Sequence, residues 1–258
     1  MSVLVIDAGN TKIKLSCWDQ DVPLPDFRNN CFFPGKTGNI PENLGTIATS
    51  VVEKPSEFLD QIKALSENVD AQPILVSVIP GVDCLLRKIF SNLKVVDSKS
   101  SFPFVHEITE AHKVGPDRWC NIAAASASGL DSALVVDAGT ATTFDLLLNG
   151  VFKGGLIAPG MVFAAEQLAR QGAMLNKAPF EERPAEVGKN SADAMTAGSW
   201  LAGIGGIEWT IARLMETYGS LPVILTGGLG HHVANEERYL DQFWTLRGAA
   251  VLAETTDP

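Results

Sequence analysis

The sequence repeats a short pattern after an interval of 130 residues. Residues 4–11, LVIDAGNT, return as residues 134–141, LVVDAGTA. In each copy an apolar run leads into Asp-Ala-Gly, and a second β-prone run follows at residues 13–18 or 143–148. A strand, a glycine turn and a second strand make a β-hairpin. The repeat therefore predicts a duplicated chain, although two unrelated hairpins would share Asp and Gly as ordinary turn residues.

The remaining pattern is that of an α/β protein. A chain of 258 residues has room for one large domain or two similar halves. Apolar spacing and proline placement predict helices, apolar runs predict buried strands, and Gly- or Pro-containing stretches predict connections. We expect helices over residues 56–68, 118–128, 161–171 and 191–218, the last with a bend near Gly203, Gly205 and Gly206. We expect strands over 73–79, 94–96 and 222–225, a connection over 154–159, and a surface loop or mobile flap over 176–189.

Charge and cysteine content narrow the class of protein. Thirty acidic against 20 basic residues give a net charge of −10, which argues against a broad nucleic-acid or anionic-membrane surface. The first residues have no basic segment typical of a signal peptide, and no stretch of 18 apolar residues predicts a membrane span. Four cysteines, Cys17, Cys31, Cys84 and Cys120, are scattered without CxxC spacing. We expect a reduced, cytoplasmic protein.

The first Asp-Ala-Gly turn has the composition of a phosphate-binding hairpin. Gly9 allows close approach of an anion, Asn10 and Thr11 supply short donors, and Lys12 or Lys14 can reach a phosphate. Asp7, at the end of a strand, is placed to hold a hydrated Mg²⁺. The alternative is a solvent-exposed turn without a ligand.

The second turn, residues 137–143, repeats this arrangement with three threonines and no lysine. A buried strand that ends in Asp137 needs a cation or hydrogen-bond donors for that charge. After the last predicted strand, Thr226, Gly227 and Gly228 offer a flat surface to a purine or ribose. A plain strand-to-helix turn explains this last motif equally well.

Gly115, Pro116, Asp117 and Arg118 lie at the expected start of a helix. Proline suits the first helical turn, and the N-H groups there favour anions. Asp117 and Arg118 are then either a dipole partner and a surface ion pair, or a substrate site. The helix that follows is rich in small residues and gives Arg118 few nearby acidic partners, so a bound carboxylate is the partner we expect.

Four other patterns carry no function. Residues 35–37 imitate the end of a P-loop, but Asn30 stands where its glycine belongs. Gly203 and Gly205 lie inside a helical pattern and indicate close helix packing. The four histidines lack zinc-site spacing. Cys120 is expected in the core, without a histidine nearby in sequence to activate it.

Taken together, these motifs resemble the type III pantothenate kinases, a family of the actin, Hsp70 and sugar-kinase superfold. The resemblance covers most of the chain, because six motifs follow in the family's order. They are residues 7–11, 115–118, 137–143, 154–160, 188–195 and 226–228.

The resemblance implies duplicated ribonuclease-H-like halves, residues 1–115 and 116–258, with a nucleotide cleft between them. It implies transfer of the γ-phosphate of ATP to the primary hydroxyl of pantothenate, the first step of coenzyme A synthesis, with Asp117 as the general base. Mg²⁺ and a monovalent cation, K⁺ or NH₄⁺ at Asp137, would be required, in a homodimer whose substrate pocket is completed by the partner. The implied substrate contacts are Gly115, Pro116, Asp117, Arg118 and Ser191, and the implied ATP contacts are Asp7, Ala8, Gly9, Asn10, Thr11, Lys12, Lys14, Gly139, Thr140, Gly227 and Gly228.

Several positions depart from the family pattern. Ile108 stands where the family tends to have a tyrosine near the substrate, and residues 109–111 replace its usual polar, Pro-containing segment. Pro116 stands where the family frequently has alanine, and Ser191 where it usually has threonine.

A kinase of the same superfold for another small alcohol, such as a sugar, and a non-catalytic regulator that keeps the fold remain alternatives. The Gly-x-Asp-Arg motif speaks against the first, and the three aspartates Asp7, Asp117 and Asp137 speak against the second.

Overall fold

The computed structural model describes residues 2–18, 24–28, 41–171 and 187–255. Contacts between residues divide the chain into two compact units. Unit 1 consists of Met1–Ala133, Asp145–Gly154 and Phe243–Pro258, and unit 2 of Leu134–Phe144 and Gly155–Gln242. Residues 116–133 thus group with the N-terminal residues, because the C-terminal helix returns to pack on them. The division of the repeat into two halves, residues 1–115 and 116–258, stays a prediction.

Unit 1 is built on a five-stranded sheet with the order β3-β2-β1-β4-β5. The predicted first hairpin is its centre: β1 and β2 are antiparallel, and β1 pairs in parallel with β4 on its other edge. Alternation of apolar and polar residues along β2 places Ile13 and Leu15 inside and Lys12 and Lys14 outside. The strands are β1 (Val3–Ala8), β2 (Lys12–Trp18), β3 (Glu42–Ala48), β4 (Gln72–Ser77) and β5 (Lys94–Val95).

The core of unit 1 forms where helix α1 (Pro55–Ser66) covers this sheet. Phe58 and Ile62 of α1 are fully buried against Leu4, Ile6 and other strand residues. The remaining helical segments of the unit are η1 (Thr49–Glu53), α2 (Val82–Leu86), η2 (Ala111–Lys113), α3 (Pro116–Ala127) and α6 (Trp244–Glu254).

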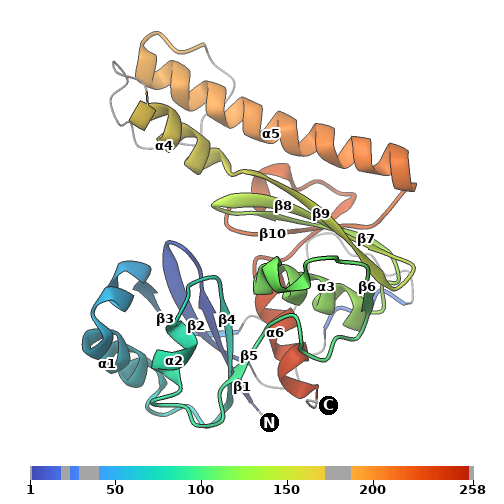
Figure 1. Cartoon of the computed structure of the whole chain (residues 1–258). Coiled ribbons are helices and arrows are strands. Elements are labelled where there is room, and N and C mark those ends of the chain that lie inside the picture. Colours follow the sequence, from blue (N-terminus) through green and yellow to red (C-terminus); the bar gives the residue numbers. More distant parts are fainter. Residues whose placement is uncertain (1, 19–23, 29–40, 172–186, 256–258) are drawn as a thin grey trace. The chain divides into compact units, whose positions relative to one another are not determined.

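Helices α3 and α6 pack closely within unit 1 (Figure 1). The indole N-H of Trp244 donates to the carbonyl of Asn121 at 3.0 Å, and Thr245 Oγ1 donates to Asn121 Oδ1 at 2.8 Å. A Cβ at Gly248 would overlap the carbonyl oxygen of Cys120, so only glycine allows this approach. Cys120 is fully buried in the helix, as predicted.

The second sheet has the order β11-β10-β7-β8-β9-β6. Its members β9-β8-β7-β10-β11 repeat the order β3-β2-β1-β4-β5 of the first sheet. The strands are β6 (Val105–His106), β7 (Ala133–Ala138), β8 (Ala141–Leu148), β9 (Val151–Pro159), β10 (Val223–Thr226) and β11 (Arg238–Leu240).

The two hairpins also agree in detail. Residues 133–140 repeat the burial pattern of residues 3–10 position by position. The carbonyl of Ala8 accepts a hydrogen bond from Val78 N at 3.2 Å, and the carbonyl of Ala138 accepts one from Leu229 N at 3.0 Å. In both sheets the donor follows the strand that pairs in parallel with the first hairpin strand. The predicted α/β fold with duplicated actin-like halves is confirmed.

Helices α4 (Met161–Gln171) and α5 (Ser191–Tyr218) lie side by side in unit 2 (Figure 1). A Cβ at Gly203 would overlap the side chain of Met161, which confirms the predicted close packing at that glycine. The same prediction was wrong at Gly205, where a Cβ would meet no atom of the described residues within 4 Å. Helix α5 runs without interruption over 28 residues, through the glycines where we expected a bend.

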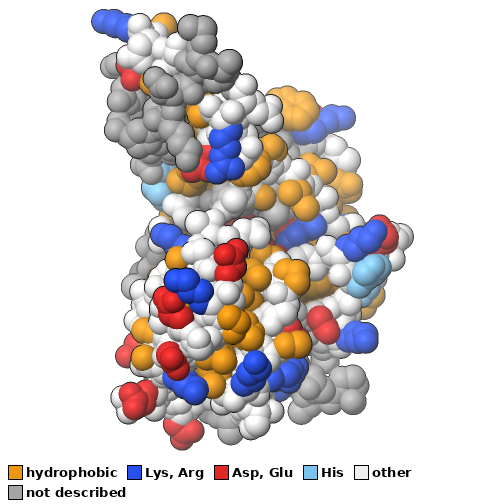
Figure 2. Space-filling view, turned by 60° about the vertical axis from the view of Figure 1, so that its left-hand side comes forward, with side chains coloured by type: hydrophobic (Ala, Val, Ile, Leu, Met, Phe, Trp, Pro, Cys, Tyr) orange, Lys and Arg blue, Asp and Glu red, His pale blue; other side chains and the backbone are white. Residues whose placement is uncertain are grey.

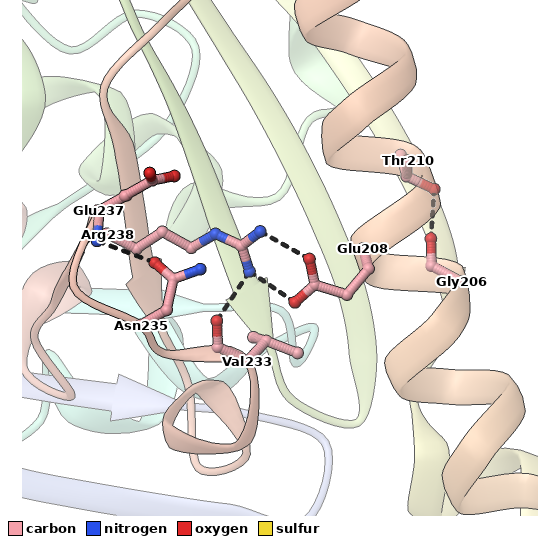
Figure 3. Close-up of polar contacts among 7 residues, drawn as sticks. All are labelled: Gly206, Glu208, Thr210, Val233, Asn235, Glu237 and Arg238. Atoms are coloured by element: carbon pink, nitrogen blue, oxygen red, sulfur yellow. Dashed lines mark hydrogen bonds and ion pairs between the residues drawn. The ribbon is translucent and has the colours of Figure 1, made fainter.

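An ion pair connects α5 to β11 (Figure 3). Arg238 donates to both carboxylate oxygens of Glu208 at 2.7 and 2.6 Å, and also to the carbonyl of Val233 at 2.7 Å. Arg238 lowers the pKa of Glu208 below its ordinary value, chiefly through these hydrogen bonds. Val233 ends the 3₁₀ helix η3 (Gly230–Val233), so one guanidinium joins three elements of unit 2.

Some elements differ from expectation. Residues 154–159, predicted as a connection, belong to strand β9, because pairing within the sheet overrides their Gly and Pro content. Strand β3 and helix α6 were not predicted. Cys31, residues 35–37 and most of the predicted loop over 176–189 lie outside the described residues. Within the part of the chain that is described, no helix has the length and apolarity needed to cross a membrane.

Both signs of charge occur together on the molecular surface. On the face drawn in Figure 2, Lys and Arg side chains are intermingled with Asp and Glu side chains. The net charge of −10 is therefore not gathered into a single acidic block on this face.

Candidate active site

The turn between β1 and β2 is tied at three points. Gly9 N donates to the carbonyl of Lys12 at 3.0 Å and closes the turn. Thr49 Oγ1 donates to the carbonyl of Gly9 at 2.7 Å, and Thr49 N donates to the carbonyl of Thr11 at 3.2 Å. Asn10 and Thr11 remain exposed at the tip. The predicted phosphate loop is thus a fixed turn with exposed short donors.

Asp7 lies beside this turn on β1. Its position pairs with Lys14 of β2, and side chains at directly opposed positions lie on the same face of the sheet. Lys12, two residues earlier on β2, lies on that face as well, and both lysines are exposed. Two cations and one carboxylate therefore share one face of the first hairpin.

Asp117 folds back over the start of α3. Its Oδ1 accepts a hydrogen bond from Arg118 N at 2.9 Å, while Pro116 occupies the first helical position, as predicted. A Cβ at Gly115 would overlap Oδ1 of Asp117. Glycine at residue 115 is therefore what lets the Asp117 carboxylate take this position.

Asp7 and Asp117 lie close enough to interact electrostatically. Burial raises the pKa of Asp7 to about 6, Lys14 opposes this increase, and the negative charge of Asp117 adds to it. Burial also raises the pKa of Asp117, which the backbone N-H of Arg118 and the Arg118 charge only partly offset. At Asp117 the increase in pKa caused by desolvation is thus larger than the decrease that the helix N-terminus causes. Perturbed carboxylates gathered in one place are typical of functional sites.

Cys120 lies one helical turn beyond this pair. Burial raises the pKa of its thiol well above the ordinary value, and the charges of Asp117 and Asp7 raise it further. The thiol therefore stays protonated, which excludes a thiolate nucleophile at this position.

Arg118 has an acidic partner that the sequence analysis missed. Its Nε and Nη2 donate to Oδ1 of Asp145 on β8 at 2.7 and 2.5 Å. Its guanidinium carbon lies 5.9 Å from the centre of the Phe152 ring. The sequence analysis considered only acidic residues near Arg118 in sequence, which are few, and so missed Asp145, which is 27 positions away.

In unit 2 the second loop and the Thr-Gly-Gly motif come together. Gly139 N donates to the carbonyl of Ala141 at 3.0 Å, and Gly160 N donates to the carbonyl of Thr140 at 3.1 Å. Thr226 pairs with Asp137 across parallel strands. Gly227 has a φ of +81°, and a Cβ there would overlap Asp137 Oδ1 and the Ala138 carbonyl. Two motifs 90 residues apart in sequence thus meet in space.

The outer edge of this loop pair is open. A Cβ at Gly228 would meet no atom within 4 Å, and Thr140 is exposed. The neighbouring Gly160 is closed in, since a Cβ there would overlap the carbonyl oxygens of Gly139 and Thr140. The arrangement combines a tightly packed base with an exposed glycine surface.

Ser191 begins α5 in an exposed position. The preceding Asn190 caps this helix, since its Oδ1 accepts a hydrogen bond from Asp193 N at 2.9 Å. The cap was not predicted, although Asn at one position and Asp three residues later is a recognisable helix-start pattern. Ile108 lies in unit 1, where its Cδ1 is 3.3 Å from the position of a Cβ on Gly154.

The structure therefore assembles the expected residues in two groups. In unit 1 it brings together the Asp7 hairpin and the start of α3 with Asp117. In unit 2 it brings together Asp137, the turn at Gly139 and Gly227. Thr49 and Asp145 support the first group and were not predicted.

Comparison with known proteins identifies the family. The family model for type III pantothenate kinase matches residues 3–213, a range that contains Asp7, Asp117 and Asp137. A type III pantothenate kinase of Geobacter sulfurreducens is 29% identical over 264 residues, and 98% of each chain is covered. Another from Listeria monocytogenes is 28% identical over 276 residues, with 99% of this chain and 98% of the relative covered.

Solved structures agree on the fold. A Baf family transcriptional activator of Campylobacter jejuni superposes with a TM-score of 0.58 and 18% identity, covering 96% of each chain. A ROK family glucokinase from Streptomyces griseus, in complex with glucose and AMPPNP, has a TM-score of 0.51 and 11% identity and covers 98% of each chain. At these identities the likeness is one of fold. The match of the family model over most of its length shows that this chain belongs to the type III pantothenate kinase family.

Proposed function

We propose that the chain transfers the γ-phosphate of ATP to the primary hydroxyl of pantothenate, the first step of coenzyme A synthesis. The observation that carries the proposal is the match to the type III pantothenate kinase model across residues 3–213. The Asp7 and Asp117 carboxylates support it, because their burial and mutual repulsion are typical of groups that act on a substrate. Family membership thus gives the reaction, and these two residues give its candidate centre.

Asp117 is proposed as the general base. The hydrogen bond from Arg118 N fixes Oδ1 and leaves Oδ2 to accept the proton of the attacking hydroxyl. A carboxylate is a weak base toward an alcohol, and the raised pKa of Asp117 makes it a stronger one. Phosphoryl transfer depends mainly on positioning and charge neutralisation, so Asp117 also serves by orienting the hydroxyl in line with the phosphate.

The substrate contacts are proposed at the start of two helices. Arg118 offers charged N-H donors to the substrate carboxylate, while Gly115 and Pro116 shape the backbone beneath Asp117. Ser191, exposed at the first residue of α5, is the remaining contact carried over from the family motif. Asp117 itself contacts the hydroxyl.

The ATP contacts are proposed on the two glycine turns and the Thr-Gly-Gly motif. The fixed turn with exposed donors supports the first, and the open glycine surface supports the second. The residues are Asp7, Ala8, Gly9, Asn10, Thr11, Lys12 and Lys14 on the first hairpin, and Gly139, Thr140, Gly227 and Gly228 on the second.

Mg²⁺ is proposed at Asp7, through water. Within the described residues no three His, Cys, Asp or Glu side chains form a metal-binding group. Mg²⁺ keeps most of its water and needs one or two carboxylates, so a single Asp suits it. The raised pKa of Asp7 marks a carboxylate whose charge is poorly compensated by the protein alone. A bound Mg²⁺ would supply charge neutralisation for the phosphates.

A monovalent cation, K⁺ or NH₄⁺, is proposed at Asp137. Oδ1 of Asp137 and the carbonyl oxygen of Ala138 both lie beside Gly227, where each would overlap a Cβ on that glycine, so two oxygen donors lie close together there. Oxygen donors of this kind suit a hard cation. The fit supports the ion without identifying it.

A homodimer whose partner completes the substrate pocket is proposed as the assembly. Leu201 and Trp209 of α5 are 48% and 69% exposed, and their spacing of eight residues places them on one face of the helix. Leu168 of the adjacent α4 is 50% exposed. Exposed apolar residues gathered on neighbouring elements support a protein interface. The cytoplasmic location stays a prediction.

The test of the proposal is Asp117→Asn, which keeps the side-chain shape and removes its basicity. We expect at least a ~100-fold loss of turnover with pantothenate, the size usual for a positioned acid or base, while ATP affinity is retained. Turnover is measured by ADP release, and ATP affinity by calorimetry. Near-wild-type turnover in this variant would remove Asp117 from the role. A parallel panel with glucose and N-acetylmannosamine tests the alternative of a sugar kinase, since faster turnover of a sugar would replace pantothenate as substrate.

A further inference from the structure

Arg118 is held in one orientation by residues of the chain itself. Its Nε and Nη2 both donate to Oδ1 of Asp145, and its guanidinium carbon lies 5.9 Å from the Phe152 ring centre. Two charge-assisted bonds to one oxygen define the plane and direction of a guanidinium far better than one bond does. The contact with an aromatic ring restricts the group from a second side.

The geometry leaves a particular part of Arg118 for a ligand. A guanidinium has five N-H donors, and Asp145 uses the Nε donor and one of the two on Nη2. The edge formed by Nη1 and the second Nη2 hydrogen remains, and this edge matches a carboxylate with two parallel bonds. Asp145 therefore determines which edge of Arg118 is presented.

Burial makes this pair persistent. Asp145 is fully buried, and the side chain of Arg118 is 12% exposed. A buried carboxylate is stable only when cations or donors compensate its charge, so separating the pair to admit a substrate carries a high energetic cost. The substrate then adds to the pair and does not replace Asp145.

We propose that Asp145 is a positioning residue that acts through Arg118 to select substrates with a terminal carboxylate. This inference rests on the proposed function, in which Arg118 contacts the carboxylate of pantothenate. Asp145 touches neither substrate nor ATP. Its effect is expected on the affinity for the charged end of the substrate and not on the phosphoryl step.

The variant that tests this is Asp145→Asn, which keeps the size of the side chain and removes its charge. We expect the KM for pantothenate to rise at least about 10-fold, as for loss of a hydrogen bond to a charged group, with kcat and the KM for ATP changed less than about 3-fold. The KM for the neutral analogue in which an alcohol replaces the carboxylate is expected to stay the same. A variant that disturbed the structure generally would raise the KM for pantothenate and the KM for the neutral analogue alike.

A double-mutant cycle separates action through Arg118 from any other action. In an Arg118→Met background, Asp145→Asn should add less than about 2-fold to the KM for pantothenate, because the proposed route through Arg118 has been removed. A further 10-fold increase in that background would overturn the inference. Glu208→Gln is the matched control. It also removes a carboxylate that accepts two hydrogen bonds from an arginine, but Glu208 lies in unit 2, so we expect the KM for pantothenate to stay unchanged.

Arg118→Lys keeps the inference testable if Asp145→Asn fails to fold. This change leaves a cation against Asp145 but provides one nitrogen, which cannot serve both the aspartate and a substrate carboxylate in the proposed way. The KM for pantothenate should rise about as much as in Arg118→Met, and an unchanged KM would overturn the inference. If the wild-type chain forms no phosphopantothenate, the proposed function fails; if it is active while these variants keep their KM, only the role of Asp145 fails.

Discussion

Gly115→Ala should disable the site without unfolding the protein. Residue 115 has φ −58° and ψ 137°, a conformation that alanine adopts freely, so the backbone is not strained. The added Cβ would overlap Oδ1 of Asp117 and lie 3.5 Å from Cγ and 3.9 Å from Oδ2. Only the carboxylate of Asp117 therefore has to move.

The size of the effect follows from this overlap. Oδ1 has to shift by more than about half an ångström to reach an ordinary contact distance, which breaks its 2.9 Å bond from Arg118 N. Displacing a reacting group by about 1 Å typically costs about 100-fold in rate. We expect kcat at saturating ATP and pantothenate to fall by about this factor. The free energy of unfolding should fall by less than about 1 kcal/mol, since alanine is only a poorer N-cap than glycine.

The assay compares kcat and urea unfolding for wild type, Gly115→Ala, Asp117→Asn and the double variant. If Gly115→Ala acts only by displacing the carboxylate, the double variant has the kcat of Asp117→Asn alone. A kcat of Gly115→Ala within about 3-fold of wild type would refute the reasoning. So would a double variant that is slower than Asp117→Asn.

Four further variants test other parts of the structure. Asp137→Asn should abolish stimulation by K⁺ while Mg²⁺ dependence remains, and unchanged K⁺ stimulation in a turnover assay would contradict the cation assignment. Because the pKa of Asp7 is raised from 3.8 to about 6, its ionisation destabilises the folded state. In Mg²⁺-free buffer the free energy of unfolding of Asp7→Asn should exceed that of wild type by about 1–3 kcal/mol at pH 8. This difference should vanish as pH falls from about 6 to about 4. Urea titrations that show no gain in stability at pH 8 would disprove this prediction. Gly248→Ala, which drives a methyl group into the backbone carbonyl of Cys120, should destabilise the protein by about 2 kcal/mol or more. Gly203→Ala should destabilise the protein less than Gly248→Ala, because its methyl group meets the side chain of Met161 and not backbone, and because alanine favours a helix more than glycine does; equal thermal shifts for the two variants would contradict this distinction.

Sequence patterns predicted the parts of the fold that are encoded locally. The repeated Asp-Ala-Gly turns predicted both hairpins, and Pro116 predicted the start of α3. The strand order common to both sheets depends on pairing between distant segments, and local patterns do not record it. Helix α6 was missed for the same reason, since its packing on α3 through Gly248 appears only in three dimensions.

The candidate site shows the same division between local and distant information. Asp7, Asp117 and Asp137 stand beside glycine or proline signals, which made them visible as candidates. Asp145 lies within an apolar strand, and its pairing with Arg118 spans 27 positions without a spacing rule. The available signal was its sequence context: an Asp in a strand otherwise composed of Ala, Thr, Phe and Leu needs a buried partner. The raised pKa of Asp117 was unforeseen because desolvation depends on the surrounding fold.

The product of the reaction tests the central claim most directly. The purified chain is incubated with ATP, Mg²⁺, K⁺ and pantothenate, and the product is identified by mass spectrometry and ³¹P NMR. We predict a phosphate ester on the primary hydroxyl of pantothenate, formed in equal amount with ADP and nearly absent with Asp117→Asn. ATP consumption without this ester, or its formation at the wild-type rate by Asp117→Asn, would contradict the account.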